Sequence, residues 1–101
     1  MANTTQIHVT ACDNELYILA STGRESSELC HIKSGFNDPV DDKFNPGHIL
    51  PPGSYELTLV GINWGGPWKF GVTTTPPIAG LSGSGSGPAG VVFTKTVPIT
   101  V

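Results

Sequence analysis

Residues 50–75 read LPPGSYELTLVGINWGGPWKFGVTTT, and this stretch decides the fold. Its apolar residues recur at every second position on both sides of a central turn, which is the pattern of two half-buried strands. They are Tyr55, Leu57, Leu59, Trp68, Phe70 and Val72. Between the two rows, residues 63–67 (NWGGP) favour a chain reversal because glycine tolerates positive φ and proline fixes φ. The stretch therefore predicts a β-hairpin whose apolar rows face one core.

The composition bounds the class of protein. A chain of 101 residues is long enough for one core, so we expect a single domain over residues 1–101. Gly and Pro number 13 and 9, and only 13% of the residues are charged, which is typical of a turn-rich β protein. The net charge of −3 argues against nucleic acid as a partner. No apolar run is long enough to span a membrane.

The N-terminus bears on the cellular compartment. Residues 1–14 lack the basic and apolar segments of a signal peptide. We therefore expect a protein that is cytoplasmic or released without such a signal, and the sequence does not decide between the two. In the absence of an export signal, Cys12 and Cys30 are expected to be free thiols, although their pairing stays open.

Other segments extend the β pattern. Residues 5–12, 15–21 and 28–33 alternate or are apolar on both faces, and residues 89–101 form a C-terminal strand. We predict an antiparallel β-sandwich, or jelly-roll-like domain, of about seven short strands with almost no helix. The predicted core residues are Ile7, Val9, Tyr17, Leu19, Ile32, Leu57, Leu59, Phe70, Val72, Phe93 and Ile99.

Two segments lack strand periodicity. Residues 34–52 read as one long loop, and loops of that length are often functional. Residues 82–87 (SGSGSG) have the composition of a flexible Gly/Ser linker. The same composition occurs in native chains and in engineered linkers, and the sequence leaves this question open.

Trp64 is the leading candidate for ligand binding. It lies in the predicted turn beside Asn63, and an exposed indole next to an amide is a platform on which a sugar ring can stack. Trp68 is in phase with Phe70 and Val72, which favours a place in the core, and it is kept as a secondary ligand-binding candidate.

Acidic residues in the long loop are the second group of candidates. Asp41 and Asp42 have oxygens suited to sugar hydroxyls, provided that the loop approaches Trp64. Together with Asp38 they are also weak candidates for a Ca²⁺ site, but their spacing matches no EF-hand loop. We therefore expect no cofactor, although the sequence leaves open whether Ca²⁺ is bound, and turn formation by Asx side chains is the favoured explanation.

These observations favour a small, non-catalytic, lectin-like module that binds a carbohydrate or another small polar ligand. We also expect a homo-oligomer, because residues 15–21 are apolar on both faces. A structural subunit of such an oligomer is the first alternative function. A small β-barrel enzyme is the second, although no catalytic motif is present.

Overall fold

The structure is a computed structural model that describes residues 2–34 and 39–101. Over those residues the chain forms eight strands and one 3₁₀ helix. They are β1 (Gln6–Cys12), β2 (Glu15–Ser21), β3 (Ser26–Lys33), β4 (Pro39–Phe44), η1 (Pro46–His48), β5 (Ser54–Asn63), β6 (Gly66–Thr75), β7 (Gly83–Gly87) and β8 (Gly90–Thr100). The predicted all-β class is confirmed, with eight strands in place of about seven. No helix in the described part of the chain is long and apolar enough to cross a membrane.

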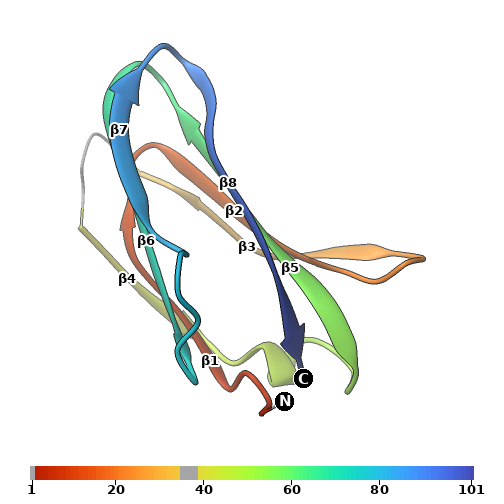
Figure 1. Cartoon of the computed structure of the whole chain (residues 1–101). Coiled ribbons are helices and arrows are strands. Elements are labelled where there is room, and N and C mark those ends of the chain that lie inside the picture. The colour runs from red at the N-terminus through yellow and green to blue at the C-terminus, as the bar shows by residue number, and fades with distance from the viewer. Residues whose placement is uncertain (1, 35–38) are drawn as a thin grey trace.

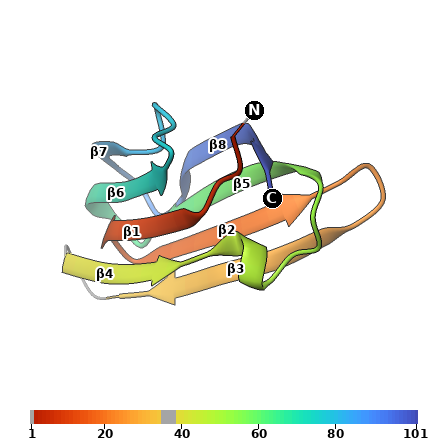
Figure 2. The ribbon, with the colours of Figure 1, turned by 90° about the horizontal axis from the view of Figure 1, so that it is seen from below.

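The strands form two antiparallel sheets that pack as a sandwich (Figures 1 and 2). One sheet has the order β4-β1-β6-β7 and the other the order β3-β2-β5-β8. We call them the β1 sheet and the β2 sheet. The two chain termini lie side by side at one end of the sandwich (Figure 1).

The predicted hairpin is wrong, because β5 and β6 belong to different sheets. The chain crosses between the sheets at residues 64–65, and it also does so between β1 and β2 and between β7 and β8. Each of these three crossings is an arch at the end of the sandwich opposite the termini (Figure 1). The expected glycines are still needed, since Gly65 and Gly66 have φ of +123° and +89°. Both apolar rows do face one core, but they face it from opposite sides.

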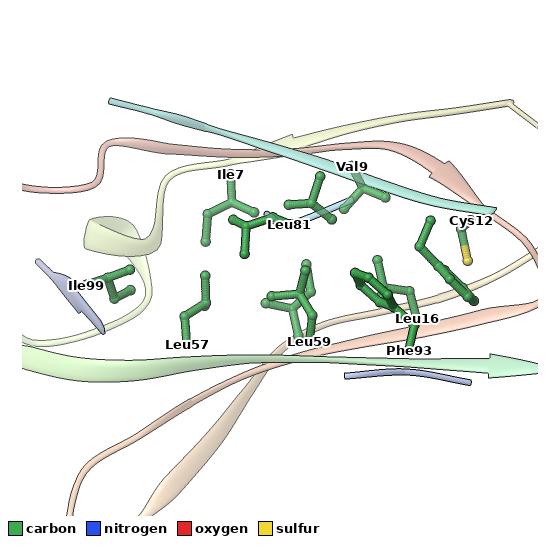
Figure 3. Close-up of a cluster of buried hydrophobic side chains, with 12 residues drawn as sticks. Ile7, Val9, Cys12, Leu16, Leu57, Leu59, Leu81, Phe93 and Ile99 are labelled. Atoms are coloured by element: carbon green, nitrogen blue, oxygen red, sulfur yellow. The ribbon is translucent and has the colours of Figure 1, made fainter. Parts of the chain in front are cut away.

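The core lies between the sheets, where side chains from both layers meet (Figure 3). Eight of the predicted core residues are buried, namely Ile7, Val9, Leu57, Leu59, Phe70, Val72, Phe93 and Ile99, and Ile32 packs against them half-buried. The prediction for β2 assigned the wrong face of the strand to the core. Leu16 and Ile18 are fully buried, whereas Tyr17 and Leu19 are half-buried on the outer face. Both faces of β2 are apolar, so period-2 alternation does not decide which one is inside.

The expected flexible linker at residues 82–87 contains a strand. Gly83–Gly87 is β7, and it pairs with β6 so that Trp68 lies opposite Gly85 and Phe70 opposite Gly83. A Cβ on Gly85 would lie 2.8 Å from Cζ2 of Trp68. The glycines therefore leave room for aromatic rings on the core side of β7, and Leu81, just before the strand, is itself buried in the core.

The predicted loop over residues 34–52 is also partly regular. It contains β4, which pairs with β1, and the short helix η1, whose first turn is capped by the Asn45 side chain. In β4 Val40 and Phe44 pack against the core, and the polar residues between them hide the strand in the sequence; such residues are tolerated on an edge strand.

Candidate functional site

Trp64 lies in the arch between β5 and β6 with about half of its surface exposed (51%). Its backbone N–H donates to the Asn14 side-chain oxygen at 2.8 Å. Asn14 belongs to the neighbouring arch between β1 and β2, where it has φ of +88°. One amide side chain therefore joins two arches and fixes the backbone from which the indole projects.

The indole is also held at its nitrogen. Its Nε1–H donates to Oε2 of Glu15 at 3.1 Å. The other carboxylate oxygen of Glu15 lies 3.2 Å from Nε2 of His31. Leu16 is in the core, so Glu15 is on the outer face of the β2 sheet. The carboxylate thus bridges Trp64 and His31 and orients both on that face.

Two further side chains complete the group. The His31 ring stacks on Tyr17, with ring centroids 3.9 Å apart and an interplanar angle of 12°. The ammonium of Lys33 lies 5.8 Å from the centroid of the Trp64 ring, within the range of a cation–π contact. Register explains the grouping, since Glu15 pairs with Lys33 and Tyr17 pairs with His31. We call these five residues the Trp64 cluster: Glu15, Tyr17, His31, Lys33 and Trp64.

The cluster stabilises a carboxylate. The hydrogen bond from Trp64 and then that from His31 lower the pKa of Glu15 below its ordinary value, and the charges of Lys33 and His31 act in the same direction. Glu15 is therefore an ionised hydrogen-bond acceptor at neutral pH, while Lys33 is a donor. An exposed ring with an acceptor at its edge and a donor over one face has the groups needed to bind a polyhydroxylated ring.

Asn63, predicted to contact a ligand, is fully buried. Its Nδ2 lies 3.0 Å from the carbonyl oxygen of Gly66, 3.2 Å from that of Gly87 and 3.4 Å from that of Pro88. The amide therefore ties the arch after β5 to the arch after β7. In this position it supports the backbone beside Trp64 and is not exposed to a ligand.

Trp68 is half-buried on the core side of β6, not on the outer face that carries Trp64. Its ring centroid lies 5.8 Å from that of Phe70 and 6.2 Å from that of Phe93. The predicted place in the core is confirmed by these contacts.

Asp41 and Asp42 lie in β4, which belongs to the β1 sheet. Asp41 is on the outer face of that sheet, where its Oδ1 is 2.7 Å from Nε2 of His8 and 3.9 Å from Nζ of Lys43. The outer faces of the two sheets point away from each other, so the structure does not bring Asp41 together with Trp64. Asp38 lies outside the described residues. Within the described ranges, no three His, Cys, Asp or Glu side chains are grouped so as to hold a metal ion.

Comparisons with protein-family models, curated proteins and solved structures found no match to this chain. Any assignment of function therefore depends on the geometry of its own residues.

Both cysteines are free thiols. Cys12 is buried, and burial is the main cause that raises its pKa to about 11.

Sequence reasoning found Trp64 but missed its neighbours. The strand patterns do place His31 and Lys33 on one face of their strand. Once Leu16 is known to be buried, it follows that Glu15 lies on the outer face of its strand. The missing information was the register between residues 15–21 and 26–33, which includes a bulge between Ile18 and Leu19.

Proposed function

We propose that the protein is a non-catalytic module that binds a carbohydrate at the Trp64 cluster. The observation that carries the proposal is the exposed indole of Trp64, held at its backbone and ring nitrogens by Asn14 and Glu15. An immobilised aromatic ring loses little entropy when a ligand stacks on it. In this proposal the apolar face of a sugar lies on the indole, the Glu15 carboxylate accepts from hydroxyl groups, and the Lys33 ammonium donates to them.

A glycan array, run with and without a chelator, tests this proposal. We expect binding to a defined set of glycans that is independent of the chelator. Trp64→Ala should weaken binding by about 1–3 kcal/mol, the range for stacking on an aromatic side chain. Ile49→Ala is a matched control, because Ile49 is equally exposed (50%) and lies outside the cluster. The proposal fails if Trp64→Ala and Ile49→Ala bind with the affinity of the wild type.

A second candidate function, a subunit of a homo-oligomer, is favoured by the outer face of the β2 sheet. Apolar side chains lie next to one another there by register, since Tyr17 pairs with Val60 and Ile62 pairs with Val91. Val91 is 60% exposed. A monomer gains nothing by exposing such a row, so its burial by a second copy would stabilise a dimer.

The position of this row favours face-to-face packing of a second copy on the β2 sheet. Pairing through the edge of β8 is disfavoured, because Pro98 lacks an N–H and Lys95 is on the inward side.

Sedimentation of the wild type and of two variants separates the candidates. Val60→Glu should dissociate the dimer, whereas Thr73→Glu, which adds the same charge to the outer face of the other sheet, should leave it intact. If the glycan array is blank while Trp64→Ala dissociates the oligomer, the cluster belongs to an interface and not to a sugar site. An enzymatic role has weaker support. The described hollows are not lined by either histidine–carboxylate pair.

A further inference from the structure

A hollow lies on the outer face of the β1 sheet, on the side of the molecule opposite the Trp64 cluster. The register between β1 and β6 shifts between Val9 and Ala11 so that Thr10 is an extra residue relative to β6, whereas the shift against β4 puts the extra residue in β4. Such a bulge redirects a side chain. Here the Thr10 Oγ1 would lie 2.5 Å from a Cβ on Gly71, so the hydroxyl occupies the space that a side chain at that position would need.

The bulge and the glycine together form a groove of about 330 Å³. That volume is at the lower end of the range for small-ligand sites, which is about 300–1,000 Å³. Its floor includes the backbone of Gly71 and Gly83, and its walls include Thr10, Lys69 and Ser84. A ligand in this groove would therefore contact main chain as well as polar side chains.

The charge on the groove lining is positive. Lys69 contributes the only charged side chain among the described lining residues, and no carboxylate accompanies it. The hydroxyl of Ser82 is bonded to both the N–H and the C=O of Val72. By contrast, among the described residues, the side chains of Thr10, Lys69 and Ser84 have no hydrogen-bond or ion-pair partner. Three donor groups at the groove are thus free to bind a ligand.

From this we propose that the groove binds an oxyanion, a carboxylate or sulfate group carried by a small polar ligand. The Lys69 ammonium supplies the charge and the hydroxyls of Thr10 and Ser84 supply hydrogen bonds, a combination that stabilises a carboxylate or sulfate more than a neutral group. The site does not depend on the Trp64 cluster, since the two lie on opposite outer faces.

The other described hollow differs from this groove in the charge of its lining. It has a volume of about 310 Å³ at the end of the sandwich near the termini, and its lining includes Tyr55 and Glu56. A carboxylate in the lining repels an anion, so similar size alone does not make an oxyanion site. The groove at Lys69 differs in the sign of its charge.

The test is a titration followed by backbone amide NMR shifts, with sulfate, glucuronate and glucose as probes at constant ionic strength. We expect sulfate and glucuronate to shift the amides of Gly71, Gly83 and Ser84, with dissociation constants in the millimolar range, and glucose to leave them unchanged. Lys69→Gln should weaken binding about tenfold or more, since it removes a charge-assisted hydrogen bond. Thr10→Val, which keeps the shape of the side chain, should weaken binding by a smaller factor.

Lys43→Gln is the matched control. Lys43 carries the same charge on the same outer face, is 55% exposed, and does not line the groove. The inference is overturned if sulfate and glucuronate cause no shifts at the groove, if glucose binds as well as glucuronate, or if Lys69→Gln and Lys43→Gln weaken binding equally. Trp64→Ala should leave these shifts unchanged, so failure of the sugar site and failure of this site are separately visible.

Discussion

Substitution of the glycines in β7 gives a sharp test of why residues 82–87 form a strand. Gly85→Ala places a methyl group 2.8 Å from Cζ2 and 3.0 Å from Cε2 of Trp68, both below ordinary contact distance. Gly87→Ala makes the same change two residues along the same strand, where nothing lies within 4 Å. Neither glycine has positive φ, so neither alanine has to adopt a left-handed backbone conformation.

The two variants should differ in sign. Overpacking against a rigid ring costs about 1–3 kcal/mol. Replacing glycine by alanine also restricts the unfolded chain, which stabilises the folded state by about 0.4–1 kcal/mol. Gly85→Ala should therefore lower the free energy of unfolding by about 1–2 kcal/mol, whereas Gly87→Ala should raise it slightly. For a domain of this size, each kcal/mol shifts the melting temperature by about 4–8 °C.

Thermal and urea unfolding of both variants and the wild type measures this difference. Tryptophan fluorescence adds a local readout, because Trp68 packs on Phe70 and Phe93 and its environment should change in Gly85→Ala alone. A flexible linker would give the same melting temperature for both alanine variants. That result would show that β7 does not pack on Trp68 and would refute the explanation of the glycine pattern.

Two further predictions concern the arches. Asn63→Ala removes a buried donor to the carbonyls of Gly66 and Gly87 and should lower the free energy of unfolding, measured in urea, by about 1–3 kcal/mol. A loss below about 0.5 kcal/mol would contradict its tethering role. Trp64→Phe removes the indole N–H that is the largest cause of the lowered pKa of Glu15, so NMR titration should give a higher pKa in the variant. A carboxyl group whose pKa is lowered in the folded protein stabilises the fold at pH values above the ordinary pKa of glutamate, and this contribution is lost as the pH falls below it. The wild type should therefore lose more free energy of unfolding than Trp64→Phe over this fall in pH. Equal losses would show that the Trp64–Glu15 hydrogen bond does not contribute to stability.

Much of the fold could be predicted because most strands bury one face only. β1 and β5 show alternation that follows directly from burial, and their core residues are correct. The buried face of β2 could not be identified from alternation, since apolar residues occupy both of its faces. β7 was missed for the opposite reason. It contributes no side chain of its own to the core, and only its alternation opposite Trp68 and Phe70 reveals its role.

The site was less predictable than the fold. Trp64 could be identified from its position in a turn, but its neighbours depend on cross-strand register, and a single bulge in β3 changes that register. Asn63 was assigned to a ligand because it lies next to Trp64 in the predicted turn. Here three arches crowd together at one end of the sandwich, and a buried amide is the group that ties their carbonyls.

The distinction between a hairpin and an arch decides where Trp64 points. Residues 63–66 have the chemistry of a reversal in either case, since Gly and Asn specify the backbone angles of a turn and not the partner of the strand that follows. In a hairpin, Trp64 would lie at the tip of two paired strands, free of β2 and β3. In the arch, β6 leaves for the other sheet, and the indole is bonded to Glu15 beside Lys33. The polar groups that make Trp64 a candidate platform for a sugar are therefore a consequence of the sandwich topology.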